Sequence, residues 1–290
     1  MRVSLSRSLI IGALMLLLSA CSALRIAYNQ APDWTYWWLD GYVDFSDEQS
    51  PRVREAVVAW FKWHRSTQLP DYAALLAQAR IQVGETMTPA QICQWTDELT
   101  DRIDRAVDHA IPALAGSVRS LSAQQLRHLE RKFEKNNQTY MAEYLQSSAD
   151  ERTKAQVKRV AERAEFFFGK LDAGQRERLA QGVAESPFDA QLWFAERKLR
   201  QQDIVQTLRR LSTQPISDDE TQAALKALFR RNVSSPRPSY RAYQLRLKDY
   251  NCSFAAQMHK LSTSEQRRRA AKQFRLWEED FRSLAADNSR

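Results

Sequence analysis

The sequence predicts an all-α fold of about ten amphipathic helices, packed as a bundle or as an irregular array of helical hairpins. Three observations predict it. Glycine and proline are few, at 7 and 9 of 290 residues, while good helix formers such as Ala, Leu, Arg, Gln and Glu are abundant. Apolar residues recur three and four positions apart, and no useful length alternates at period two. Helix-start signals recur along the same stretch.

The first element, residues 1–20, has the layout of a signal peptide. Basic residues come first, an apolar run spans residues 9–18, and two small residues precede Cys21. The apolar run is too short to cross a bilayer. Leu18-Ser19-Ala20-Cys21 resembles the lipobox of bacterial lipoproteins, which implies cleavage before Cys21 and acyl chains such as palmitate on that cysteine. The alternative is an ordinary secretory signal in which the cysteine stands by chance.

The residue after the cysteine bears on location. Ser22, rather than an aspartate, favours sorting to the outer membrane of a Gram-negative cell. We therefore expect a lipid anchor on the periplasmic face of the outer membrane.

Residues 21–46 form an aromatic neck between the expected anchor and the helical body. Two interpretations are open: the rings lie at the lipid headgroups, or they pack as a lid on the helices. Acidic residues interrupt the stretch, which favours packing. The aromatic residues are Tyr28, Trp34, Tyr36, Trp37, Trp38 and Tyr42.

Residues 47–290 are expected to form the helical domain. Apolar stripes at helical spacing predict the core-facing sides of its helices. The clearest stripes are Ile92, Leu99, Ile103, Ala106, Ala110 and Leu114; Leu126, Leu129, Phe133, Tyr140 and Tyr144; Val157, Val160, Ala164 and Phe167; and Ala270, Phe274, Trp277, Phe281 and Leu284.

Six helix starts share one signature, in which an apolar residue precedes a capping residue and Gln or Glu follows three positions later. This spacing is typical of a capping box, in which the cap and the later residue satisfy each other's backbone N–H groups. The six pairs are Ser46 with Gln49, Thr88 with Gln91, Ser122 with Gln125, Asp172 with Gln175, Ser217 with Glu220, and Ser262 with Glu265. A possible internal break lies near 232–238, where Ser234–Pro238 reads as a linker.

Cys93 and Cys252 are the other two cysteines of the chain. In an oxidising periplasm, one disulfide between them is expected, and it would contribute about 2–5 kcal/mol to stability. The alternative is a pair of free buried thiols.

Charge and motifs exclude several function classes. The net charge of +8 suits an anionic envelope polymer or simple solubility, and the charges are too interleaved for nucleic acid. No Gly-x-Ser-x-Gly elbow, P-loop or dinucleotide turn occurs. His64, His109, His128 and His259 have no metal-ligand spacing, so neither metal nor cofactor is expected. His64 is expected as a satisfied core or boundary residue.

Four aspartates line one predicted helical face. Such a stripe fits a divalent cation or a basic partner, while a solvated face opposite Leu99 and Ile103 explains it equally simply and is favoured. The four are Asp97, Asp101, Asp104 and Asp108.

Two resemblances add to this interpretation. The helix starts resemble the Leu-Thr-x-x-Gln motif of small periplasmic stress adaptors and chaperones. The segment from Trp34 to Gln49, directly after the lipobox, resembles the opening of a family of uncharacterised proteobacterial outer-membrane lipoproteins. That resemblance implies export, anchoring and helices, and it implies no catalytic residues.

Two functions remain as hypotheses. The first is a non-catalytic binding or scaffolding lipoprotein with an envelope protein or polymer as its partner. The second is an envelope hydrolase that acts on cell-wall glycan through unrecognised carboxylates. A pocket holding two carboxylates of raised pKa would favour the hydrolase, and a smooth amphipathic groove would favour the binding protein.

Overall fold

The fold is all-α, as predicted, in a computed structural model that describes residues 23–287. No strand occurs within that range. Helices α3 and α4 are joined without a break by the one-turn π-helix η1, so the described chain forms ten separate helical segments. No helix in it is long and apolar enough to cross a membrane. The helices are α2 (Ala23–Val43), α3 (Ser50–Trp63), η1 (His64–Gln68), α4 (Leu69–Gln82), α5 (Pro89–Arg119), α6 (Ala123–Tyr144), α7 (Ala149–Phe168), α8 (Ala173–Ala184), α9 (Ala190–Thr213), α10 (Asp218–Val233), α11 (Pro238–Lys260) and α12 (Ser264–Ala286).

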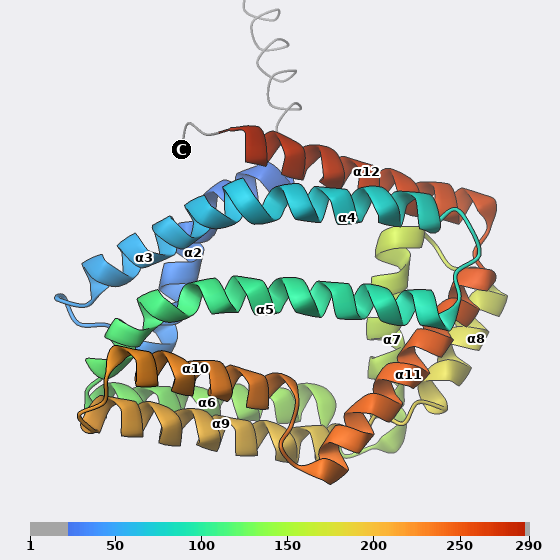
Figure 1. The fold of residues 1–290 in the computed structure, drawn as a ribbon. Helices are drawn as coiled ribbons and strands as arrows, with labels where there is room; N and C mark the ends of the chain where they lie inside the picture. The colour runs from blue at the N-terminus through green and yellow to red at the C-terminus, as the bar shows by residue number, and fades with distance from the viewer. Residues whose placement is uncertain (1–22, 288–290) are drawn as a thin grey trace, which may run out of the picture.

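The helices form an open array rather than a parallel bundle (Figure 1). Helices α4 and α12 lie side by side along one edge, and α6, α9 and α10 form the opposite edge. The long helix α5 runs between these edges and contacts α9, α10 and α11. One end of the array is formed by α2 and α3, and the other by α7, α8 and α11. This second end, together with the adjoining end of α4 and α12, surrounds the candidate site.

The α4–α12 pair is the most extensive helix contact in the described chain. Small buried residues on both helices, Ala73 and Ala79 on α4 and Ala270 on α12, favour close approach. The buried carboxylate of Glu278 on α12 accepts a hydrogen bond of 3.3 Å from Arg80 on α4. The predicted stripe of α12 is thus confirmed, although its sequence pattern did not show that an acidic residue is buried beside it.

Four predicted capping boxes are present, at Thr88, Ser122, Asp172 and Ser217. The last box begins one residue later than predicted, with Thr263 as the cap and Gln266 as its partner. The reason is that Ser262 lies in the turn that ends α11, where its backbone N–H donates to the carbonyl of His259.

The first predicted box is only half formed. The backbone N–H of Ser46 donates to Gln49 Oε1 at 3.1 Å, but Ser46 and Gln49 lie in a turn and α3 begins at Ser50. The Ser46 hydroxyl pairs with Glu48 instead of capping a helix.

The box glutamines join helix starts in pairs. At one end of the array, Gln125 Nε2 donates to the Gln49 side chain at 2.6 Å and to the Asp44 carbonyl at 2.9 Å. At the other end, Gln175 and Gln266 are joined in the same way. The glutamines predicted as parts of capping boxes therefore also connect helices far apart in the sequence.

The aromatic neck is itself a helix, α2, so the helical series begins earlier than the predicted residue 47. Its tyrosines pack: Tyr36 is buried beside Phe45, and the Tyr28 hydroxyl lies 2.9 Å from His64 Nδ1. Its tryptophans Trp34, Trp37 and Trp38 are 52–61% exposed, and Trp38 contacts the ring of Tyr42 on the same helix. The packing interpretation holds for the tyrosine side of this helix alone.

The stripe predicted for α5 is wrong in part. Leu99 and Ile103 were expected to face the core, yet they are 54% and 48% exposed. The core contacts of α5 come from Ile111 and Ala115, which pack with residues of α9 and α10. The side that Leu99 and Ile103 occupy is thus not buried along the whole length of α5, which runs between two edges of the array (Figure 1).

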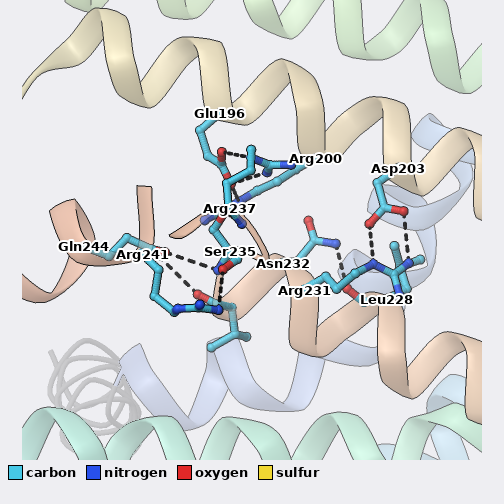
Figure 2. Close-up of polar contacts among 11 residues, drawn as sticks. Glu196, Arg200, Asp203, Leu228, Arg231, Asn232, Ser235, Arg237, Arg241 and Gln244 are labelled. Atoms are coloured by element: carbon cyan, nitrogen blue, oxygen red, sulfur yellow. Dashed lines mark hydrogen bonds and ion pairs between the residues drawn. The ribbon is translucent and has the colours of Figure 1, made fainter. Parts of the chain in front are cut away.

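The predicted linker Ser234–Pro238 is a tight turn between α10 and α11 that is tied to α9 (Figure 2). Buried Glu196 on α9 accepts hydrogen bonds from Arg237 in the turn at 2.5 and 2.7 Å and from Arg200 at 3.1 Å. Burial alone would raise the pKa of Glu196, but the hydrogen bonds from Arg237, Ser235 and Arg200 outweigh burial and hold its pKa below the usual value. The turn therefore has a fixed position on the α9 surface.

Candidate functional site: an apolar pocket

A pocket of about 410 Å³ lies where α4, α5, α7, α8, α11 and α12 converge, and we call it the apolar pocket. Its volume falls within the range of sites for small ligands, and its lining has the usual pattern of many apolar groups and a few polar ones. The lining residues are Ala79, Val83, Met87, Ile92, Trp95, Val160, Arg163, Ala164, Phe167, Phe168, Leu171, Gln175, Leu179, Phe254, Ala255, Met258, His259, Ser262, Gln266 and Phe274.

A small buried cluster supports one wall of the pocket. Leu171 and Leu179 belong to it, and Phe254 and Met258 of α11 pack against it. Phe254 fits because Gly182 on α8 has no side chain, since a Cβ there would stand 2.0 Å from the Phe254 ring. The position of this ring therefore depends on the glycine.

Covalent and polar links hold two further walls. The predicted disulfide between Cys93 and Cys252 is present and joins α5 to α11. Cys93 adjoins Ile92 in the lining, and Cys252 stands one helical turn before Ala255. Nearby, Trp95 Nε1 donates to Gln82 Oε1 at 2.6 Å, which ties α5 to the end of α4.

The glutamine pair borders the pocket but offers no free hydrogen-bonding group to it. Gln175 Nε2 donates to Gln266 Oε1 and to the Leu261 carbonyl, and Gln266 Nε2 donates to Gln175 Oε1 and to the Lys170 carbonyl. Both side-chain oxygens also accept from the backbone of their own caps. The pair therefore has a structural role in the lining of the pocket.

His259 is the other buried polar group in the lining. The residue is 5% exposed, and its Nε2 lies 3.0 Å from the Val83 carbonyl. Burial lowers its pKa, as does Arg267, against the opposing effect of the hydrogen bond to Val83. The ionisable side chains of the lining are His259, whose imidazole is neutral, and Arg163, which is an exposed residue. The interior of the pocket therefore holds no buried charge.

The aspartate stripe lies elsewhere on α5, outside the apolar pocket. Asp97 pairs with Lys248 of α11, and Asp108 lies 3.9 Å from Lys226 of α10. Asp101 and Asp104 are exposed between them. In residues 23–287, no group of three or more metal-ligating side chains lies close enough to hold an ion.

The remaining predicted site residue, Cys21, lies outside the described residues, as does the expected signal peptide 1–20. His64 is buried and hydrogen-bonded, as predicted. The sequence interpretation missed His259, because a lone histidine on a helix has no spacing signal. It also missed the apolar pocket, whose lining is spread from residue 79 to residue 274.

The resolved pKa shifts of carboxyl groups are all downward. Glu48 and Glu220 are exposed groups whose hydrogen bonds at helix starts or turns lower their pKa, and Glu196 is held low by arginines. None of these three residues lines the apolar pocket. Among the described residues, no aspartate or glutamate lines the apolar pocket.

The fold and pocket define a class of all-α helical-array protein with an apolar pocket between its helices. The model of a family of unknown function, DUF6279, matches residues 41–241, and the chain belongs to that family. No curated protein and no solved structure matches the chain. The matched range includes α3 to α10 and thus the pocket residues from Ala79 to Leu179. The pocket residues from Phe254 to Phe274, on α11, α12 and the turn between them, lie outside it.

Proposed function

We propose that the protein is a non-catalytic binding protein of the bacterial envelope, anchored by lipid on Cys21, whose apolar pocket holds the hydrophobic part of a ligand. The observation that carries this proposal is the pocket itself, with about 410 Å³ of space and an uncharged interior. Burial of apolar surface contributes about 25 cal/mol per Å² to binding before the costs of association are subtracted. A pocket of this lining therefore favours a hydrophobic ligand over a charged one.

The anchor is proposed from the sequence. The basic, apolar and small residues before Cys21 match a lipoprotein signal, and the disulfide between Cys93 and Cys252 suits an oxidising compartment such as the periplasm. An outer-membrane location in a proteobacterium follows from Ser22 and from the resemblance of the segment Trp34–Gln49.

The scaffolding form of the same proposal rests on the surface. The exposed tryptophans of α2 and the exposed apolar residues of α5 provide area for an envelope protein, and the basic excess suits an anionic envelope polymer. The hydrolase alternative has no comparable support, because the shifted carboxyl groups are shifted downward.

Palmitate labelling tests the anchor. In cells that export the protein, labelling with radioactive palmitate should mark the wild-type chain and not the variant Cys21→Ala. Equal labelling of both proteins, or labelling of neither, would contradict lipidation at Cys21.

Photocrosslinking tests the pocket. A dodecane that carries a diazirine should form adducts with residues such as Phe167 and Met258 when it is irradiated with the purified full-length lipoprotein. The variant Ala255→Phe, which fills the pocket, should lose these adducts, and the control Ala242→Phe, on an exposed site of the same helix, should keep them. Adducts confined to the tryptophans of α2 would contradict the proposal.

A further inference from the structure

His259 has one ring nitrogen with a partner and one without. Its Nε2 lies 3.0 Å from the Val83 carbonyl, and a carbonyl oxygen can only accept, so Nε2 carries the proton. The neutral ring therefore has a lone pair on Nδ1. This atom is buried and has no hydrogen-bond partner in the described chain.

An unpaired buried acceptor is unfavourable, because it has lost its bonds to water without gaining others. The free-energy cost of such a group is about 1–3 kcal/mol, and native structures keep few of them. His259 is one of the residues that line the apolar pocket, and the glutamines there, Gln175 and Gln266, already satisfy each other. In the described chain, Nδ1 of His259 is thus the one buried side-chain nitrogen or oxygen of the lining that lacks a hydrogen-bond partner.

We infer that the apolar pocket takes an amphiphile whose apolar chain carries one neutral hydrogen-bond donor, a hydroxyl or an N–H, and that this donor binds Nδ1 of His259. This inference rests on the proposed function and specifies the ligand class of the same site. A carboxylate or a phosphate diester is disfavoured at this position, because neither anion has a proton to donate to Nδ1 and its charge would be buried among apolar groups. The neutral state of the ring agrees with its lowered pKa, for which burial is the main cause.

Competition between two isomers tests the donor. Dodecanol and methyl undecyl ether have the same atoms, but only the alcohol can donate a hydrogen bond. Each is titrated against the crosslinking of diazirine-bearing dodecane to the full-length lipoprotein, and the ratio of the half-competing concentrations, ether over alcohol, is measured. This ratio should be about three- to tenfold higher in the wild type than in His259→Phe, as expected for one hydrogen bond.

The outcomes separate the two proposals. An equal ratio in the wild type and His259→Phe, with both competitors active, would overturn the donor and leave the pocket as an apolar site. If the diazirine-bearing dodecane crosslinks in the pocket but neither competitor lowers the yield, the proposed ligand class is overturned. If no crosslink forms in the pocket, the proposed function itself is contradicted.

A second measurement needs no variant and so does not depend on the folding of His259→Phe. In protein labelled with ¹⁵N-histidine, dodecanol should move the Nδ1 resonance of His259 upfield, because its lone pair then accepts a hydrogen bond. Methyl undecyl ether should leave it in place. The same shift with both ligands, or with neither, would overturn the inference.

Discussion

The side-chain amides of Gln175 and Gln266 donate to each other, at 2.8 and 2.9 Å, although 91 residues separate them. Each glutamine also completes the capping box of its own helix, so that the starts of α8 and α12 are held together beside the apolar pocket. The same relationship joins Gln49 and Gln125 at the far end of the array. Buried amides of this kind stabilise because every donor and acceptor is satisfied.

We expect Gln175→Ala to lower the free energy of unfolding by about 1–3 kcal/mol, because it removes both hydrogen bonds between the two amides and the bond to the Leu261 carbonyl. Urea unfolding measures this loss. The control is Gln91→Ala, which removes a box glutamine whose side chain serves only its own cap and should cost less. In a double-mutant cycle, Gln175 and Gln266 should show a coupling energy of about 0.5–3 kcal/mol. Additive losses would contradict a direct pair.

Replacing the disulfide should destabilise the protein and loosen the pocket. We expect the variant with Cys93→Ala and Cys252→Ala to lose about 2–5 kcal/mol of unfolding free energy and to crosslink less to diazirine-bearing dodecane, because α5 and α11 are no longer joined. Urea unfolding and the crosslinking yield measure the two effects. Unchanged stability on reduction of the wild type would show that the bridge does not constrain the chain.

The glycine beneath Phe254 should not tolerate a side chain. Gly182→Ala places a methyl group where the Phe254 ring lies, so the ring must move, and overpacking of this kind costs about 1–3 kcal/mol. Thermal unfolding should show a lower midpoint, and the pocket should lose crosslinking at Met258. The control Gly116→Ala has open space around its Cβ and should be neutral or stabilising.

Buried Glu196 should matter more than exposed Asp203, although both bind an arginine through two hydrogen bonds. Glu196 is 3% exposed and Asp203 is 34% exposed in their side chains. We expect Glu196→Gln to cost about 1.5–3 kcal/mol and Asp203→Asn about 0–1 kcal/mol. Equal losses in urea unfolding would show that the turn before α11 is not held mainly by Glu196.

Acid should weaken the fold through His64. Burial lowers the pKa of His64 to about 4, while an unfolded histidine titrates near its usual value of 6.5. The neutral ring therefore contributes stability that is present above pH 6.5 and is lost as the pH falls toward 4, by about 3 kcal/mol in all.

The variant His64→Gln keeps a hydrogen-bonding group for Tyr28 but does not titrate. Its unfolding free energy should therefore fall less than that of the wild type between pH 6.5 and pH 4. Parallel pH profiles of the two proteins would assign the acid sensitivity to other groups.

Local features of the fold were predictable from the sequence. The boxes at Thr88, Ser122, Asp172 and Ser217 depend on residues three positions apart, and the structure has all four. The disulfide was predictable as well, because the chain has only two cysteines beyond Cys21.

The features that were not predictable depend on how distant helices meet. Leu99 and Ile103 repeat at helical spacing, but spacing alone does not say that their side of α5 lacks a neighbour. His259 becomes a candidate ligand group only because Val83, 176 residues earlier, takes its other nitrogen. The pairing of Gln175 with Gln266 likewise needs α8 and α12 to begin at the same place.

A crystal structure of the protein with ω-bromododecanol tests the central claim most directly, because the anomalous signal of bromine locates the chain of the ligand. We predict a bromine peak and continuous ligand density among Phe167, Phe254 and Met258, inside the apolar pocket. An empty pocket, with bromine only on the exposed tryptophans of α2, would contradict the account.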